Sequence, residues 1–427
     1  MKTPPSILFL NRVYPPADGA TGKLLAELAP ALVQRGHRVT VVTAESGAGG
    51  KPGEHVNGVQ VERVHGLPFT RASHWRRALS YLSLYPALLW CALRLPRADV
   101  VVTLTDPPLL LLLGVLIKTV KGSRHIHWAQ DLYPELAEEM KVLPQGGVVA
   151  RTLRWLSTGG LRHADRVIAV GRCMKARIIA RGVKPTAVQI IPNWGHSAEA
   201  TGGSRVANPF RVEHELGGRF VVMYSGNLGL AHPFEAILDA AERLRESHPT
   251  ALFLFVGSGP RLHWVREQVL KRSLHNVRFL PFQPKEKLAH SLAAADIHLA
   301  SMQHELCGLV VPSKVYGVMA AGRPCVFLGP EESEAAQFIL QHGCGSVLTK
   351  ATGARLASCL AQWMGDESLL RETRDRVEAV AERVSLGAAV RAFSHSIQEI
   401  GGSSSIPARL KASEPHSPIT STMTTSS

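Results

Sequence analysis

The feature of this sequence that most constrains its fold is the regular alternation of short apolar runs with stretches of helical periodicity. In the first half the apolar runs are "SILFLN", "RVTVVTA", "VQVERV", "DVVVTL", "HIHWAQ", "RVIAVG" and "VQIIPN". In the second half they are "FVVMYSG", "LFLFVGSG", "VRFLPF", "DIHLAS", "PCVFLG" and "GSVL". Strands that are apolar along most of their length and separated by helices are typical of parallel sheets covered on both faces. The sequence therefore predicts an α/β protein.

The alternation forms two separate series, and a chain of 427 residues is too long for one ordinary hydrophobic core. We predict two Rossmann-like domains, over residues 1–195 and 219–384, joined by the polar, Gly-rich linker 196–218. A helix at about 385–400 is expected to pack back on the first domain. Residues 401–427 are rich in Ser, Thr and Pro and are expected to be disordered. Ligands are expected in the cleft between the two domains.

Charge is distributed unevenly along the chain. Residues 1–200 contain 25 Lys and Arg against 13 Asp and Glu, a net charge of +12, whereas residues 201–427 contain 23 against 21. A strongly basic half indicates an anionic partner, either a phosphorylated ligand or an anionic membrane surface. No nucleic-acid reading module is recognisable, so we do not expect nucleic acid as a partner.

Two apolar stretches bear on membrane association. The run Leu109–Ile117 is far shorter than the roughly 20 residues needed to cross a bilayer. The stretch Tyr81–Leu95 is interrupted by Pro86 and flanked by arginines, so it predicts either an interfacial helix or an ordinary helix packed on a sheet. No signal-peptide pattern is apparent, and the six cysteines lack CxxC or metal-like spacing. We expect a cytoplasmic protein, peripheral at the inner face of the cell membrane.

Three strand-to-helix junctions in the second half can cradle an anion, because the first backbone N–H groups of a helix point outward unpaired. They lie in "YSGNLG", "FVGSGP" and "VPSKVYG", and their candidate binding residues are Gly226, Asn227, Gly257, Gly259, Ser313 and Lys314. A lysine in the first turn of a helix is unfavourable next to the helix dipole. It is accounted for if a phosphate lies between Lys314 and the helix; the alternative is that Lys314 simply points to solvent.

The first half offers a glycine loop and two acidic residues. The loop in "NRVYPPADGATGK" contains Gly19 and Gly22, and it either approaches a ligand closely or is only a tight turn. Asp131 and Glu135 follow the strand "HIHWAQ" within a turn of each other, where a general base or a group that orients sugar hydroxyls is expected. No Asp-x-Asp occurs, so we expect no metal and no cofactor, and a diphosphate would be neutralised by lysine and amides.

These motifs, in this order, resemble the family 4 retaining glycosyltransferases of GT-B fold over roughly residues 6–400. The resemblance is carried by "YPPADGATGKLLAELAPALVQRGHRVTVVT", "ADRVIAVG", "IIPNW", "YSGNLG", "FVGSGP", "NVRFLPFQPKEKLAHSLAAADIHLAS" and "PSKVYGVMAAGRP". The variants "DLYPE" and "PSKVYGVMAAGRP" look most like the subgroup that builds bacterial surface polysaccharides, including colanic acid and O-antigen. The resemblance implies two Rossmann-like domains that face each other across a cleft.

The resemblance also implies residue roles on the donor side. Gly226 and Asn227 match the loop that contacts the donor diphosphate, although the usual Arg and Lys of that loop are absent. Phe282 and Gln283 match the segment beside the nucleobase.

Further matches flank the transferred sugar. Ser313 and Lys314 match the subgroup's Pro-Ser-Lys next to the donor, and Asp131 matches a position near the transferred sugar that many relatives fill with His.

Gly317 occupies a position where the family signature differs from this chain. The signature contains two glutamates eight positions apart, and here these places hold Leu309 and Gly317. The second glutamate normally holds the ribose, so Gly317 bears on the affinity for the donor and on the identity of its nucleotide. Glu305, four residues before Leu309, is a candidate substitute.

The resemblance implies a retaining, metal-independent transfer of sugar from a nucleoside diphosphate sugar to a saccharide or polyprenyl-linked acceptor. Asp131 and Lys314 would be the catalytic residues, and Gly19, Gly22 and Glu135 would lie on the acceptor side. Two alternatives remain open: a nucleotide-sugar 2-epimerase of the same fold, and a catalytically silent subunit that binds the donor or acts as a scaffold.

Overall fold

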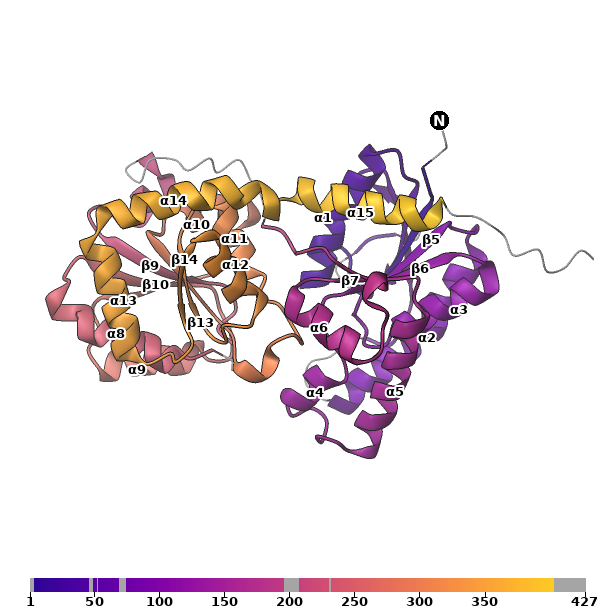
Figure 1. Ribbon diagram of the computed structural model, residues 1–427, viewed down its shortest axis with the longest axis horizontal. Helices are drawn as coiled ribbons and strands as arrows, with labels where there is room; N and C mark the ends of the chain where they lie inside the picture. The colour runs from indigo at the N-terminus through magenta and orange to yellow at the C-terminus, as the bar shows by residue number, and fades with distance from the viewer. Residues whose placement is uncertain are drawn as a thin grey trace, which may run out of the picture.

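The computed structural model describes residues 4–45, 49–51, 53–68, 74–195, 207–229 and 232–402. Most of the expected linker (196–206) and nearly all of the expected tail (403–427) lie outside the described residues. The described residues form two α/β units, each built on one sheet (Figure 1).

The N-terminal unit contains, within the described residues, an eight-stranded sheet in the order β3-β4-β2-β1-β5-β6-β7-β8. Its strands are β1 (Ile7–Leu10), β2 (Val39–Ala44), β3 (Glu54–Val56), β4 (Val59–Val64), β5 (Val100–Thr103), β6 (Arg124–Ala129), β7 (Arg166–Ala169) and β8 (Val188–Ile190). All neighbours are parallel except β3 and β4, which form a hairpin at the sheet edge. Its two-residue turn, Asn57 and Gly58, has positive φ at both positions, as such hairpins favour.

The C-terminal unit contains a six-stranded, entirely parallel sheet within the described residues, in the order β11-β10-β9-β12-β13-β14. Its strands are β9 (Phe220–Ser225), β10 (Ala251–Val256), β11 (Val277–Leu280), β12 (Ile297–Ser301), β13 (Cys325–Leu328) and β14 (Gly345–Leu348). The strand order reverses between β9 and β12. In a doubly wound sheet this reversal opens the crevice in which ligands bind.

Helices cover both faces of the two sheets. The N-terminal unit carries α1 (Ala20–Gln34), α2 (His74–Arg94), α3 (Leu111–Lys121), α4 (Glu135–Glu139), α5 (Val148–His163), α6 (Arg172–Ala180) and the 3₁₀ turn η1 (Pro185–Ala187). The C-terminal unit carries α7 (Pro209–Glu213), α8 (Phe234–Ser247), α9 (Leu262–Lys271), α10 (Lys285–Ala293), η3 (His304–Leu306), α11 (Lys314–Ala320), α12 (Glu334–His342), α13 (Gly353–Gly365), α14 (Glu367–Ala381) and η4 (Glu382–Val384). The last helix, α15 (Leu386–Gly401), crosses back to the first unit and packs against α1 and β5 (Figure 1).

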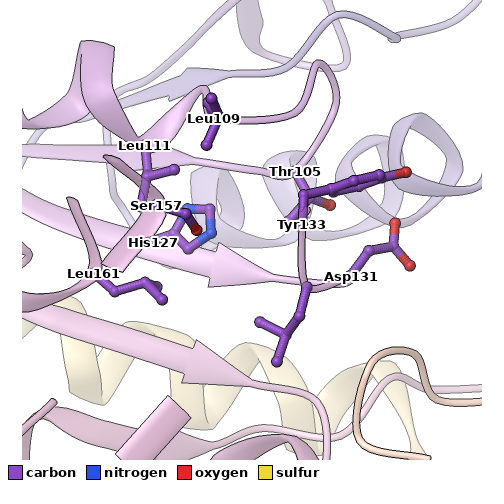
Figure 2. A pocket seen from close by; sticks show the side chains of 9 residues that line it. Thr105, Leu109, Leu111, His127, Asp131, Tyr133, Ser157 and Leu161 are labelled. Atoms are coloured by element: carbon purple, nitrogen blue, oxygen red, sulfur yellow. The ribbon is translucent and has the colours of Figure 1, made fainter. Parts of the chain in front are cut away.

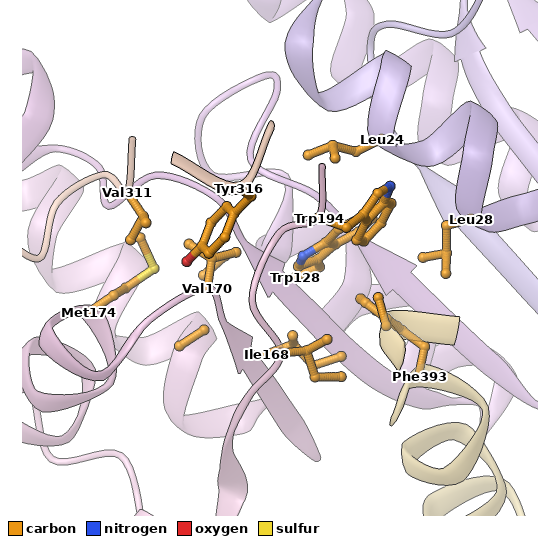
Figure 3. Packing of buried hydrophobic residues seen from close by; sticks show 14 of the residues in the cluster. Leu24, Leu28, Trp128, Ile168, Val170, Met174, Trp194, Val311, Tyr316 and Phe393 are labelled. Atoms are coloured by element: carbon orange, nitrogen blue, oxygen red, sulfur yellow. The ribbon is translucent and has the colours of Figure 1, made fainter. Parts of the chain in front are cut away.

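One hydrophobic core extends from the first unit into the second and joins the two walls of the cleft. The rings of Trp128 and Trp194 stack with their centroids 6.0 Å apart, and Phe393 of α15 packs edge-on against Trp128 at 4.8 Å. The cluster continues to Tyr316 of α11, which is fully buried beside the N-terminal unit (Figure 3). The backbone N–H of Leu132 also donates to the carbonyl of Leu309 at 2.9 Å across the two units. The two units that border the cleft are therefore packed against each other through this core.

Helix α2 packs on the sheet, which is one of the two alternatives that its sequence left open; the interfacial alternative stays a prediction. Leu84 and Leu88 are buried and the helix packs on β2 and β4, whereas Leu82 and Trp90, on nearly the opposite side, are 64% and 59% exposed. No helix in the described part of the chain combines the length and apolar character that crossing a bilayer requires.

Candidate active site

Lys314 lies at the reversal point of the C-terminal sheet. Its ammonium donates to the hydroxyl of Tyr224 at 2.5 Å and to the carbonyl of Asn227 at 3.2 Å, and it lies 4.2 Å from the centre of the Tyr224 ring. Tyr224 is the penultimate residue of β9, and its hydroxyl donates in turn to the same carbonyl at 3.0 Å. Two residues far apart in the sequence thus hold one another at the start of α11. Lys314 does not simply extend into solvent.

The loop after β9 accommodates Lys314 because it contains Gly226. This residue has φ of +127°, and a Cβ there would lie 2.7 Å from Cε of Lys314. A side chain would be strained by the backbone and would displace the lysine. The glycine therefore lets the aliphatic part of Lys314 lie directly on the loop.

The loop after β10 lies directly on the loop after β9. The N–H of Leu228 donates to the carbonyl of Ser258 at 2.9 Å. A Cβ on Gly257 would be 2.1 Å from the carbonyl oxygen of Gly226, and one on Gly259 would be 2.6 Å from Oδ1 of Asn227. The structure thus brings these predicted donor residues and Lys314 together on one surface.

The electrostatics of this surface favour an anion. Burial lowers the pKa of Lys314 to about 8, and the partners of its ammonium among the described residues are a hydroxyl and a carbonyl, with no carboxylate. Burial, together with the positive charge of Lys314, also lowers the pKa of His232 to about 4. The neutral His232 ring is held by the hydroxyl of Ser301 at 2.8 Å. A bound phosphate would supply the negative charge that this partly buried ammonium lacks.

The other predicted donor residues border this surface. Ser313 is exposed immediately before α11. Phe282 is 58% exposed, with Cε1 of its ring 3.3 Å from where a Cβ on Gly257 would lie. The side-chain amide of Gln283 donates to the carbonyl of Pro281 at 3.0 Å. The aromatic face of Phe282 is therefore available beside the glycine loop.

The two places of the family's glutamates have different environments. Leu309 is 1% exposed, and its backbone joins the two units through Leu132. At Gly317, within α11, the nearest atom to a Cβ would be Cδ1 of Leu292 at 3.7 Å, which is ordinary contact. A Cβ therefore fits at Gly317 without rearrangement. Glu305, the candidate substitute, is exposed in η3 and lines a separate cleft with His232.

Asp131 lies at the end of β6, on the N-terminal wall. Burial raises its pKa to about 7, and the nearby charge of Asp106 adds to the effect. Figure 2 shows Asp131 and Tyr133 pointing to the same side, away from His127. His125 and His127 are buried and hydrogen-bonded to the hydroxyl of Thr103 at 2.9 and 3.1 Å, so they act as packing residues.

The predicted acceptor-side residues have partners within the chain. Glu135 forms ion pairs with Arg154, at 2.9 Å, and with Arg181, so both of its carboxylate oxygens are engaged. The positions of a Cβ on Gly19 and Gly22 lie 2.9 and 2.8 Å from Cγ1 of Val13. These glycines allow the start of α1 to pack closely on its own loop.

A cavity of about 960 Å³ connects the two units. Asn227, His232, Ser301 and Lys314 lie among the residues of the C-terminal unit that line it, and residues of α2, α4 and α5 line most of its N-terminal side. Asp131 does not line it, but the neighbouring Tyr133 does. The sequence analysis did not identify Tyr133 or Tyr224 as site residues. Tyr224 could have been found, because it lies only two residues before the predicted Gly226.

Two family models match the chain, and between them they cover all strands of the two sheets except β1. Residues 19–194 match the glycosyl transferase 4-like domain, and residues 208–383 match the glycosyl transferases group 1. With the two facing Rossmann-like units, these matches define the class of protein. The chain belongs to the glycosyltransferases of GT-B fold.

Individual relatives agree with this class. The chain is 30% identical to a probable glycosyltransferase, WbjE, of Pseudomonas aeruginosa over 252 residues, which cover 59% of this chain and 62% of WbjE. It is 26% identical to the putative colanic acid biosynthesis glycosyl transferase WcaI of Escherichia coli (strain K12) over 358 residues, covering 78% of this chain and 85% of WcaI.

Among solved structures, Anabaena HepE in complex with UDP-glucose has a TM-score of 0.69 at 17% identity, covering 92% of this chain and all of HepE. WaaG, a glycosyltransferase involved in lipopolysaccharide biosynthesis, has a TM-score of 0.64 at 18% identity, covering 92% of this chain and 99% of WaaG.

Proposed function

We propose that this glycosyltransferase moves a sugar from a nucleoside diphosphate sugar to a saccharide or lipid-linked saccharide acceptor in cell-surface polysaccharide biosynthesis. We further propose that the reaction retains the anomeric configuration and needs no metal. The observation that carries the proposal is the partly buried ammonium of Lys314, which lies on the glycine loop at Gly226 without a carboxylate partner among the described residues.

The proposed reaction uses this positive charge at the leaving group. The donor diphosphate would lie along the loops at Gly226 and Gly257, with Lys314 against its phosphate oxygens. As the bond between the sugar C1 and the phosphate oxygen breaks, negative charge on that oxygen grows and its attraction to Lys314 strengthens. The acceptor oxygen forms the new bond to C1 on the same face and passes its proton to the departing phosphate oxygen. Attack from the face of departure gives retention.

Asp131 is proposed to orient the acceptor or the transferred sugar. Its segment is held against the C-terminal unit by the bond from Leu132 to Leu309. The ionised carboxylate accepts hydrogen bonds from sugar hydroxyls, and with a pKa of about 7 it forms as the pH rises through neutrality. This property suits a group that positions hydroxyls near neutral pH.

The relatives support the substrate class. HepE is solved with UDP, with UDP and glucose and with UDP-glucose, which supports a nucleotide sugar as donor. WcaI and WaaG are described by colanic acid and lipopolysaccharide biosynthesis, which supports an acceptor of the bacterial surface. An anionic membrane surface is the proposed location, because Leu82 of α2 and Trp155 of α5 are 64% and 74% exposed on the basic half of the chain.

A thermal-shift screen of nucleoside diphosphate sugars in excess EDTA tests the proposal. A bound donor stabilises the protein in proportion to its occupancy, so one nucleotide sugar should raise the Tm without metal. The best donor, labelled in the sugar, is then incubated with and without a saccharide acceptor. Product that forms only with the acceptor supports transfer, whereas a new nucleotide sugar formed from the donor alone would indicate an epimerase. No stabilisation by any donor would overturn the proposal.

A further inference from the structure

The cavity between the two units extends away from the expected nucleobase. Its inner end is formed by Asn227 and Lys314, where the donor diphosphate is proposed to lie. Gly257 and Phe282, beside which the nucleobase is expected, do not line it. From the transfer point the cavity therefore leads into the N-terminal unit, the side on which an acceptor must enter.

The wall of this outward part is apolar. It is formed by Leu82 and Tyr85 of α2, Leu143 of the α4–α5 turn, and Val149 and Leu153 of α5. The aliphatic side chains of this wall offer no hydrogen bonds to sugar hydroxyls or phosphates, and removing those groups from water against them is unfavourable. A hydrocarbon chain, by contrast, gains free energy when it leaves water for such a surface.

The cavity opens onto exposed apolar residues. Leu82, Met140 and Val149 belong to its lining and are also 64%, 51% and 59% exposed. On α2 the apolar surface continues to Trp75, two turns before Leu82 on the same side of the helix and 61% exposed. An apolar path thus runs from the molecular surface to the transfer point.

We propose that this groove, formed by α2, the α4–α5 turn and α5, binds the hydrocarbon chain of a lipid-linked saccharide acceptor. The inference rests on the proposed function, because its inner end is the place where that function needs an acceptor hydroxyl. The groove is continuous with the place where the sugar is transferred, so its ligand must have a polar end at Lys314 and an apolar end at α2. A lipid-linked saccharide has these two ends.

Charge along the groove agrees with a phosphorylated lipid. Arg77 of α2 lines the cavity, and Arg76 and Arg151 are exposed on the two helices that border it. These cations can attract the phosphates that link a sugar to its lipid, while the chain lies on the apolar wall.

The test compares chains of increasing length on one headgroup. Calorimetry on the full chain would use inorganic diphosphate, geranyl diphosphate and farnesyl diphosphate as probes. The affinity should rise with chain length, and farnesyl diphosphate should bind at least about tenfold more tightly than inorganic diphosphate. Equal affinities of the wild-type protein for the three probes would overturn the proposal, so this test needs no variant.

A matched pair of variants locates the binding site. Leu82→Asn with Val149→Asn alters the groove at side chains that are more than half exposed, so the fold should persist. The control, Leu270→Asn with Val212→Asn, makes the same replacements at positions 79% and 70% exposed on α9 and α7. The groove pair should weaken farnesyl diphosphate about tenfold and leave inorganic diphosphate unchanged. An equal loss in the control pair would contradict the location.

The outcome separates this inference from the proposed function. A protein that binds a nucleotide sugar and glycosylates a soluble saccharide, but shows no dependence on chain length, keeps its function and lacks the lipid groove. A protein that no nucleotide sugar stabilises lacks the function, whatever its affinity for farnesyl diphosphate.

Discussion

Replacing Lys314 by Met should impair catalysis without impairing stability. Burial lowers the pKa of Lys314 from 10.5 to about 8, which corresponds to roughly 3 kcal/mol of unfavourable solvation of the ammonium. A donor phosphate would recover most of that free energy, most strongly as charge develops on the leaving group. We therefore expect kcat/KM for the donor to fall about 10²-fold, in the range seen when one such charge-stabilising group is removed.

We expect the Lys314→Met variant to be at least as stable as the wild-type protein. Because the lysine pKa is lower in the folded protein, its charge destabilises the fold below about pH 8, and this effect disappears as the pH approaches 10.5. Methionine has a similar length and no charge, so the Tm at neutral pH should be unchanged or higher. Lys271→Met, at an exposed lysine of α9, serves as the control and should change neither quantity. A Lys314→Met variant with wild-type kcat/KM and a lower Tm would refute the reasoning.

Three further predictions follow from the site. The pH profile of kcat/KM should rise near pH 7 as Asp131 ionises and fall near pH 8 as Lys314 loses its proton. Asp131→Asn should remove the rise near pH 7. A profile unchanged by that substitution would contradict the role given to Asp131. Gly317→Glu, whose Cβ would make only ordinary contact, should lower the donor KM by placing a carboxylate where the family resemblance implies a contact with the ribose. Gly317→Ala should leave KM unchanged and stabilise the helix by up to about 1 kcal/mol. Trp155→Asn should reduce cosedimentation with phosphatidylglycerol vesicles more than Leu270→Asn does; equal effects would argue against membrane contact through α5.

Much of the fold was predictable because parallel strands buried on both faces are apolar along their length. β10 (Ala251–Val256) is buried at every position and was evident from the sequence. β3 (Glu54–Val56) was missed, because a short, polar edge strand has no such pattern. Its existence depends on pairing with β4, which only the folded sheet supplies.

The sequence predicted which loops form the site, but not which side chains contact one another there. Strand-to-helix junctions pointed to Gly226 and Lys314, yet the contact of Lys314 with Tyr224 joins residues 90 positions apart. Likewise, the sequence could not reveal that Glu135 is engaged by Arg154 and Arg181. Such partners are set by tertiary packing, and they decide whether a charged side chain is available to a ligand.

The most direct test of the central claim is proton uptake when the donor binds. The claim is that the ammonium of Lys314 contacts the donor diphosphate directly, without a metal ion between them. At pH 8 about half of the Lys314 side chains are deprotonated, and contact with a phosphate raises their pKa. Calorimetric titration with the nucleotide sugar, in excess EDTA and in two buffers of different ionisation enthalpy, should show uptake of up to about half a proton, absent in Lys314→Met. Binding that requires a divalent ion, or that takes up no proton, would contradict the account.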